Sequence, residues 1–244
     1  MPRVLNISEK PGMFYHDLRR LIRRDLLESI GLKPKEEIPG DTVMVFGASG
    51  VGKTLFCMVL AADVVQAGKK VFYMDTEGNL SRVPDGIDYE FVTGKTGEEV
   101  LRKSLDTLNN LIRSDQRYDL VVVDSLTTPV IAAYGESDMR TKGDMMMKAI
   151  TFSSKIRYYT RLHNSLAVVV YQPSSAMGKE EEVPPPRAPS SHYYYKAVIH
   201  STKEMMKDVT TFRYYSWRMR GIPDGTLLYS IEVKKDGMRL ISWV

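Results

Sequence analysis

The stretch that decides the fold is Gly47-Ala48-Ser49-Gly50-Val51-Gly52-Lys53-Thr54, which matches the phosphate-binding pattern G-x-x-x-x-G-K-[ST] at every fixed position. Residues 42–46 before it form an apolar run typical of a buried strand, and residues 55–62 after it form an apolar run typical of a helix. The motif requires a strand, a glycine loop and a helix in that order. The sequence therefore predicts an α/β protein that binds a nucleoside triphosphate.

The residue types in this loop explain the expected chemistry. Glycines let consecutive backbone N–H groups turn toward an anion, and the helix that follows adds its positive N-terminal end. We expect the Lys53 ammonium to reach the β- and γ-phosphates and the Thr54 hydroxyl to ligate Mg²⁺, with the whole loop lining the nucleotide. The alternative is a glycine-rich turn without a ligand, which the flanking strand and helix disfavour.

The composition indicates an ordinary globular chain. Its 244 residues are 43% hydrophobic and 26% charged, with a formal net charge of +4, which fits one α/β domain or a domain with a short appendage. This charge permits a polyanionic partner without requiring one. No apolar run is long enough to cross a bilayer and the first residues lack the apolar core of a signal peptide, so we expect a cytoplasmic protein without a membrane partner. Cys57, the sole cysteine, is expected to be a small buried hydrophobe.

Residues 1–40 precede the predicted nucleotide-binding core and contain an amphipathic helix over 17–27. Next to its apolar face lies a basic face made of Arg19, Arg20, Arg23 and Arg24. Such arginines either point into solvent or contact DNA phosphates or an acidic partner. We interpret residues 1–40 as an N-terminal extension and residues 41–244 as the core.

Strand-like and helix-like segments alternate after the glycine loop. The expected strands are 70–75, 89–92, 120–124 and 165–171, and the expected helices are 97–113 and 139–163. Because most of these strands are almost wholly apolar, they predict a parallel sheet covered by helices on both faces.

The pattern changes in the last third of the chain. Short strands joined by turn sequences are expected at 197–206, 210–219, 226–233 and 238–243, and they predict an antiparallel extension of the sheet. Between the two halves lies segment 174–192, which contains three consecutive glutamates and three consecutive prolines. We expect it to form a long mobile loop.

Two acidic residues follow predicted core strands. Asp124 ends the strand 120–124, where its carboxylate can support Mg²⁺ together with Thr54, although an aspartate there can also cap a turn. Glu77 follows the strand 70–75 and is the expected general base for the water that attacks the γ-phosphate.

With these motifs, the chain resembles the RecA/RadA recombinase superfamily from about residue 38 onward, and especially its short archaeal paralogues without the amino-terminal DNA-binding domain. Asp75-Thr76-Glu77-Gly78 is similar to the catalytic-glutamate motif of the family, and residues 121–125 are similar to its metal-aspartate strand. Residues 169–172 resemble the strand that ends in a glutamine sensing the γ-phosphate, here Gln172. The resemblance implies a RecA-like P-loop NTPase fold and the use of ATP and Mg²⁺.

Further cations resemble residues that reach the nucleotide in this superfamily. Trp217-Arg218-Met219-Arg220-Gly221 is similar to a segment of KaiC-type relatives in which two cations contact the ATP of a neighbouring subunit. Since Arg218 and Arg220 are two apart on an expected strand, they are predicted to share a face, either as trans-acting fingers in an oligomer or as solvated residues. Arg82 resembles an adenine-stacking arginine. His200 aligns loosely with a histidine that links nucleotide to a DNA-binding loop, but an ordinary strand histidine is favoured.

The two positions that hold DNA-binding loops in recombinases give opposite signals. Segment 127–143 carries Arg140 and Lys142, which suit phosphate contact, whereas the glutamates of 174–192 repel DNA. The tyrosines at 193–195 either stack on bases or pack in the interior. The methionines at 145–147 are expected to fill a core or a subunit interface.

Three functional hypotheses follow. The favoured one is a Mg²⁺-dependent ATPase, accessory to DNA recombination and repair, that binds single- or double-stranded DNA and assembles with itself or a RecA/RadA-family protein. The first alternative is a KaiC-like ATPase switch that regulates a protein assembly without DNA. The second is a nucleotide-locked structural subunit, against which the presence of both Glu77 and Asp124 argues.

Overall fold

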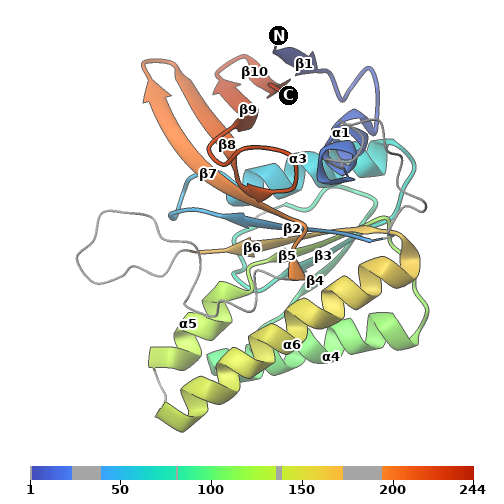
Figure 1. The fold of residues 1–244 in the computed structure, drawn as a ribbon, viewed down its shortest axis with the longest axis vertical. Helices are drawn as coiled ribbons and strands as arrows, with labels where there is room; N and C mark the ends of the chain where they lie inside the picture. The colour runs from blue at the N-terminus through green and yellow to red at the C-terminus, as the bar shows by residue number, and fades with distance from the viewer. Residues whose placement is uncertain (1, 24–39, 81, 136–138, 173–193) are drawn as a thin grey trace.

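Ten strands form one sheet in the part of the chain that the computed structural model describes, which is residues 2–23, 40–80, 82–135, 139–172 and 194–244 (Figure 1). They are β1 (Arg3–Leu5), β2 (Asp41–Phe46), β3 (Val71–Asp75), β4 (Ile87–Phe91), β5 (Leu120–Asp124), β6 (Leu166–Tyr171), β7 (Ala197–Met206), β8 (Val209–Met219), β9 (Leu227–Lys234) and β10 (Gly237–Ser242). Their order across the sheet is β1-β10-β9-β8-β7-β2-β6-β5-β3-β4.

The sheet changes character at β7. The strands from β7 to β4 in this order run parallel, and β8, β9, β10 and β1 continue from β7 in antiparallel pairs. Every residue of β2, β3, β5 and β6 is buried, which explains why these strands appear in the sequence as continuous apolar runs. The predicted parallel sheet with an antiparallel extension is confirmed.

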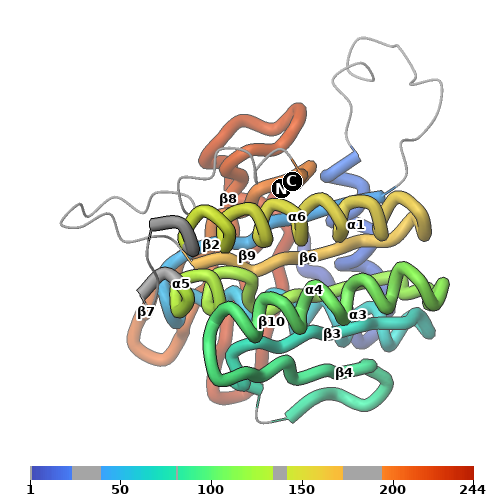
Figure 2. The backbone as a smooth tube through the Cα atoms, turned by 90° about the horizontal axis from the view of Figure 1, so that it is seen from below, coloured from blue at the N-terminus to red at the C-terminus, as the bar shows by residue number. Residues whose placement is uncertain are grey.

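Helices cover both faces of the parallel strands (Figures 1 and 2). One layer holds α1 (Met13–Arg23) and α3 (Lys53–Gln66), and the other holds α4 (Gly97–Arg113), α5 (Thr127–Gly135) and α6 (Met139–His163). Alternate residues of β2 divide between the two layers: Val43 and Val45 belong to the core with α1 and α3, whereas Met44 and Phe46 belong to the core with α4 and α6.

Two helices differ from the sequence prediction. Segment 127–143 contains α5 and the start of α6, because Val130 and Ala133 are buried in the core that α4 also lines. Helix α1 begins at Met13 rather than near residue 17, because Asp63 of α3 accepts the first N–H groups of this turn. The N–H groups of Gly12 and Tyr15 donate to the Asp63 carboxylate at 2.8 and 2.9 Å. Residues 24–27 of the expected helix lie outside the described residues.

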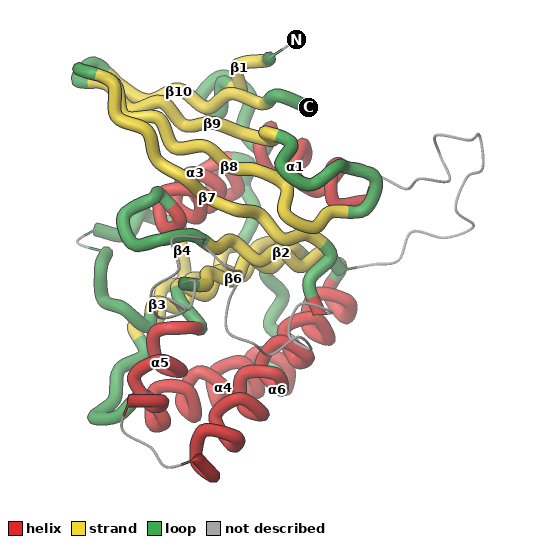
Figure 3. The backbone as a smooth tube through the Cα atoms, turned by 60° about the vertical axis from the view of Figure 1, so that its left-hand side comes forward, coloured by secondary structure: helices red, strands yellow, loops and turns green. Residues whose placement is uncertain are grey.

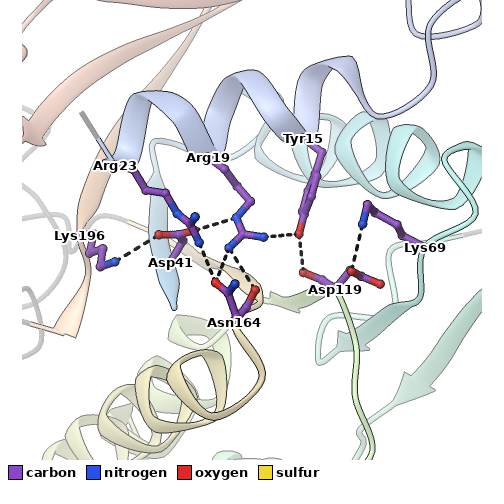
Figure 4. Close-up of polar contacts among 8 residues, drawn as sticks. All are labelled: Tyr15, Arg19, Arg23, Asp41, Lys69, Asp119, Asn164 and Lys196. Carbon is purple, nitrogen blue, oxygen red and sulfur yellow. Dashed lines mark hydrogen bonds and ion pairs between the residues drawn. The ribbon is translucent and has the colours of Figure 1, made fainter. Parts of the chain in front are cut away.

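The arginines of α1 hold this helix to the sheet (Figure 4). Arg19 Nε and Arg23 Nε donate to Asp41 Oδ2 at 2.8 and 2.9 Å, and Lys196 Nζ donates to Asp41 Oδ1 at 3.2 Å. Asp41 is fully buried at the start of β2. Arg19 and Arg23 are therefore not simply solvated, since the carboxylate of Asp41 accepts their hydrogen bonds. Contact of this face with DNA stays a prediction.

The remaining arginines of that face differ from this pair. Arg20 pairs with Asp17 at 2.8 Å, and Arg24 lies outside the described residues. Phe14 and Leu18 of α1 are fully buried in the core shared with α3, and β1 pairs with β10. The division of the chain at residue 40 stays a prediction.

The antiparallel strands reach past the parallel ones (Figure 3). β7 pairs with β2 only from Ala197 to His200, and its second half continues beyond the end of β2 in a hairpin with β8. The phosphate loop starts at Gly47, directly after β2, so the hairpin runs beside that loop.

Candidate nucleotide-binding site

Four predicted site elements meet at one edge of the sheet. The adjacent strands β2, β6, β5 and β3 are parallel, so their carboxyl ends lie side by side. The phosphate loop follows β2, Gln172 follows β6, Asp124 ends β5 and Glu77 follows β3. In open α/β sheets, this edge is where ligands bind.

The phosphate loop has the backbone that its glycines predict. Gly50 and Gly52 have φ of +75° and +91°, a left-handed region that glycine adopts without steric cost. Helix α3 begins directly afterwards at Lys53. The Lys53 ammonium donates to the carbonyls of Gly47 and Ala48 at 2.8 and 2.6 Å. The ammonium thus lies against the first two residues of the loop.

Thr54 and Asp124 lie in contact, as a shared metal site requires. Thr54 Oγ1 and Tyr73 OH both donate to Asp124 Oδ2, at 2.7 and 2.9 Å. Burial raises the pKa of Asp124, the hydroxyl hydrogen bonds oppose this shift, and the nearby charges of Glu77 and Asp75 add to it. A carboxylate and a hydroxyl at this distance fit the oxygen ligands that Mg²⁺ prefers.

Glu77 is surrounded by hydrogen-bond donors. Its Oε1 accepts bonds from Ser125 Oγ and Thr128 Oγ1, both at 2.6 Å, and from Gln172 Nε2 at 3.1 Å. Its Oε2 accepts a bond from Asn79 Nδ2 at 2.7 Å. Glu77 and Gln172, predicted from separate strands, therefore touch.

Several supporting residues were missed by the sequence analysis. Asp75 Oδ1 accepts the N–H groups of Glu77 and Gly78, both at 2.8 Å, and so shapes the turn that carries Glu77. Tyr89 OH donates to Asp75 Oδ2, and burial together with this bond raises the pKa of Tyr89 to about 12. An aspartate three residues before a glycine was a usable signal for Asp75. The roles of Ser125 and Thr128 had no such signal.

The predicted peripheral cations lie outside this cluster of hydrogen bonds. Arg82 is exposed in the segment after Glu77. The sequence analysis expects Arg218 and Arg220 to share one face of a strand. Arg218 is exposed on β8, but β8 ends at Met219 and Arg220 belongs to the turn that follows, so strand alternation does not apply to this pair. His200 stacks on Phe46 at 4.8 Å between ring centroids and lies edge-on to Trp217.

The methionines, tyrosines and cations named near the two DNA-binding loop positions differ in burial. Met145 is fully buried, whereas Met147 is 60% exposed. The Tyr195 hydroxyl lies 3.1 Å from those of Ser153 and Tyr171, so Tyr195 packs in the interior. Lys142 lies on α6. The side chain of Arg140, residue 193 and the whole of 174–192 lie outside what the structure describes.

The described residues hold neither a preformed metal-ligand cluster nor a membrane-spanning helix. They contain no group of three or more histidine, cysteine, aspartate or glutamate side chains arranged to hold a metal. None of their helices combines the length and apolarity needed to span a membrane.

The strand, glycine loop and helix on a mostly parallel sheet with an antiparallel extension define the class of RecA-like P-loop α/β proteins. The fold is similar to a crystal structure described as the RadB recombinase, with a TM-score of 0.60 and 18% sequence identity. The superposition covers 88% of this chain and 96% of the chain in that crystal structure. This likeness shows the shared fold.

Sequence comparison leads to the same proteins. The DNA repair and recombination protein RadB of Methanobrevibacter smithii is 33% identical over 113 residues, covering 42% of this chain and 47% of that protein. The protein of that name from Methanocaldococcus jannaschii is 27% identical over 145 residues, covering 54% and 64%. The matches thus span about half to two thirds of these two relatives. No protein-family model matches the chain. The chain resembles the RadB proteins of the RecA/RadA superfamily in sequence and has their RecA-like fold.

Proposed function

We propose that this protein is a Mg²⁺-dependent ATPase of the RadA-paralogue kind, acting in DNA recombination and repair. The observation that carries the proposal is the convergence of Lys53, the Thr54–Asp124 pair and the Glu77–Gln172 pair at the carboxyl edge of the sheet. The names of the RadB relatives supply the biological setting.

The phosphate loop and Lys53 would bind the triphosphate. The Lys53 ammonium exchanges its two carbonyl partners for phosphate oxygens, while the loop N–H groups and the start of α3 surround the anion. Arg82 is proposed to contact the base, and Arg218 and Arg220 to reach ATP from a neighbouring subunit.

Thr54 and Asp124 would hold the metal. When bound, Mg²⁺ neutralises charge on the β- and γ-phosphates. Tyr73 keeps the Asp124 carboxylate in place through its bond to Oδ2. We expect the ion to enter with the nucleotide, because Mg²⁺ is usually held by one or two protein ligands together with substrate phosphates.

Glu77 would take a proton from the attacking water. Three donors share its Oε1, which has two lone pairs, whereas its Oε2 accepts one bond among the described residues, from Asn79. Oε2 can therefore accept the attacking water directly, and Oε1 can do so only after a donor leaves. We propose that Gln172 leaves, because its 3.1 Å bond is the longest of the three and its expected role is to sense the γ-phosphate. Departure of Gln172 would then make Oε1 available to water when the nucleotide arrives.

The test is ATP hydrolysis by wild type and Glu77→Gln, with Mg²⁺ or with chelator, and with or without single-stranded DNA. Loss of a general base lowers kcat by about 100- to 10,000-fold, while the amide leaves ATP affinity within a few fold. Lys53→Ala is the matched variant that loses affinity as well. Absence of Mg²⁺-dependent hydrolysis under every condition would refute the enzyme.

The KaiC-like switch without DNA remains the second candidate, favoured by the internal pairing of Arg19 and Arg23, which removes these two cations from a DNA-binding face. Binding of single-stranded DNA across a salt series separates the two. Phosphate contacts make the affinity fall steeply as salt rises, by a power law in salt concentration. No DNA binding at low salt, with ATP present, would favour the switch.

A further inference from the structure

The β7–β8 hairpin contacts the phosphate loop through two buried hydroxyl groups. Ser201 Oγ of β7 donates to the carbonyl of Val51 at 2.6 Å, and Tyr214 OH of β8 donates to the carbonyl of Gly52 at 2.9 Å. Ser201 and Tyr214 are fully buried and directly opposite each other in the hairpin. The two bonds thus reach consecutive carbonyls of the loop from adjacent strands.

Glycines allow this close approach. A side chain on Gly47 would collide with the carbonyl of Ser201, and one on Gly52 would collide with the ring of Phe212, which also belongs to the hairpin. Gly50, by contrast, has no atom within 4 Å of the position that a Cβ would take. One side of the loop is therefore packed against the hairpin at Gly47 and Gly52, and the loop is open at Gly50.

The orientation of a carbonyl fixes the N–H group of the same peptide unit. In a trans peptide, the C=O and the following N–H point in opposite directions. The bond from Ser201 to the Val51 carbonyl therefore sets the direction of the Gly52 N–H. The bond from Tyr214 to the Gly52 carbonyl, which also accepts the Phe56 N–H of α3 at 2.9 Å, helps to set that of the Lys53 N–H. Both N–H groups then point away from the hairpin, as an anion-binding loop requires.

We propose that Ser201 and Tyr214 are positioning residues for the phosphate groups of the nucleotide, which preorganise the loop for anion binding. This inference rests on the proposed nucleotide-binding function. Neither residue touches the nucleotide; each acts through a loop carbonyl. A preformed loop binds phosphate without first ordering its peptides, so the hydroxyls strengthen binding rather than speed the chemical step.

The test uses Ser201→Ala and Tyr214→Phe, which each delete one hydroxyl. We expect the KM for ATP, and the Kd of a non-hydrolysable ATP analogue with Mg²⁺, to rise about 5- to 10-fold, the usual weight of one hydrogen bond, while kcat changes less than about twofold. Ser201→Thr, which keeps a hydroxyl, is expected to restore most of the affinity. Tyr215→Phe is the matched control, because it removes a hydroxyl from the adjacent residue on the opposite face of β8.

The outcomes separate the inference from the function on which it rests. Wild type that binds the analogue, with both variants binding it equally well, overturns the positioning role. A fall in kcat at unchanged KM overturns it too, since that pattern belongs to a group acting in the transition state. Wild type that binds no nucleotide overturns the proposed function and the positioning role together. Denaturant unfolding of each variant verifies that it folds. If Tyr214→Phe does not fold, the comparison of Ser201→Ala with Ser201→Thr tests the positioning role.

Discussion

Two buried aspartates at opposite ends of the parallel strands have different hydrogen-bond partners. Asp41 opens β2 and accepts hydrogen bonds from three cationic side chains, those of Arg19, Arg23 and Lys196. Asp124 ends β5 and accepts bonds from two hydroxyl groups, those of Thr54 and Tyr73. Their exposed fractions are 0% and 5%, so burial alone does not distinguish them.

The difference shows how one residue type can serve packing at one end of the strands and be suited to a ligand at the other. The charge of Asp41 is balanced by side chains of the chain itself, which attach α1 to the sheet. Asp124 is held in place by neutral donors, so no cationic side chain among these donors balances its charge, and burial raises its pKa. A buried carboxylate with hydroxyl partners is therefore suited to an external metal, whereas one with arginine partners is suited to packing.

The largest effect is expected from Asp41→Asn. This change leaves three partly buried cations without the carboxylate they share, and removal of one partner from a buried ion pair costs about 3–5 kcal/mol of unfolding free energy. Denaturant unfolding followed by circular dichroism measures it. Nucleotide affinity of the protein that remains folded should be unchanged, and a stability equal to wild type would show that the Asp41 cluster does not hold α1.

The corresponding substitution at the carboxyl end of β5, Asp124→Asn, should lower nucleotide affinity and leave the unfolding free energy unchanged or higher. Both hydroxyls donate to Oδ2, and the amide oxygen of asparagine can accept both bonds, so unfolding free energy should stay equal or rise. Mg²⁺-supported ATP affinity should fall about 10- to 100-fold, because the charged metal ligand is lost. Calorimetric titration with and without Mg²⁺ measures this. A Mg²⁺-supported affinity equal to that of wild type would contradict the metal role.

The smallest effect is expected from Arg20→Ala. The Arg20 side chain is 65% exposed, and its partner Asp17 keeps bonds from Arg3, Tyr229 and Ser242. Exposed ion pairs contribute about 0–1 kcal/mol, so the unfolding free energy should fall by less than about 1 kcal/mol. Thermal unfolding is sufficient to check this. A larger loss of unfolding free energy would mean that exposure does not explain why the Arg20 ion pair should matter less than those of Arg19 and Arg23 with Asp41.

The sequence predicted the parallel part of the fold and the central site residues because their signals are local. The loop Gly47–Thr54 is a contiguous motif, and Asp124 follows its own apolar strand. Parallel strands bring their carboxyl ends to one edge, so residues at those ends meet without further information. The contacts Thr54–Asp124 and Glu77–Gln172 follow from that rule.

Long-range contacts could not be predicted in this way. The start of α1 depends on Asp63, 51 residues from Gly12, and the pairing of Arg23 depends on Asp41, 18 residues away. Ser201 and Tyr214 lie 150 and 162 residues from their loop partners. A single sequence carries no signal for such pairs, and a polar residue on a strand is compatible with many partners.

The pairing of β1 with β10 determines the order in which the fold can be completed during synthesis. Asp17 is translated early, yet its donors Tyr229 and Ser242 lie 212 and 225 residues further along the chain. At about 5–20 residues per second, the last of these donors follows Asp17 by roughly 10–45 s, counted over those 225 residues. Throughout that interval β1 lacks the strand with which it pairs, so this end of the sheet can be completed only after β10 has left the ribosome.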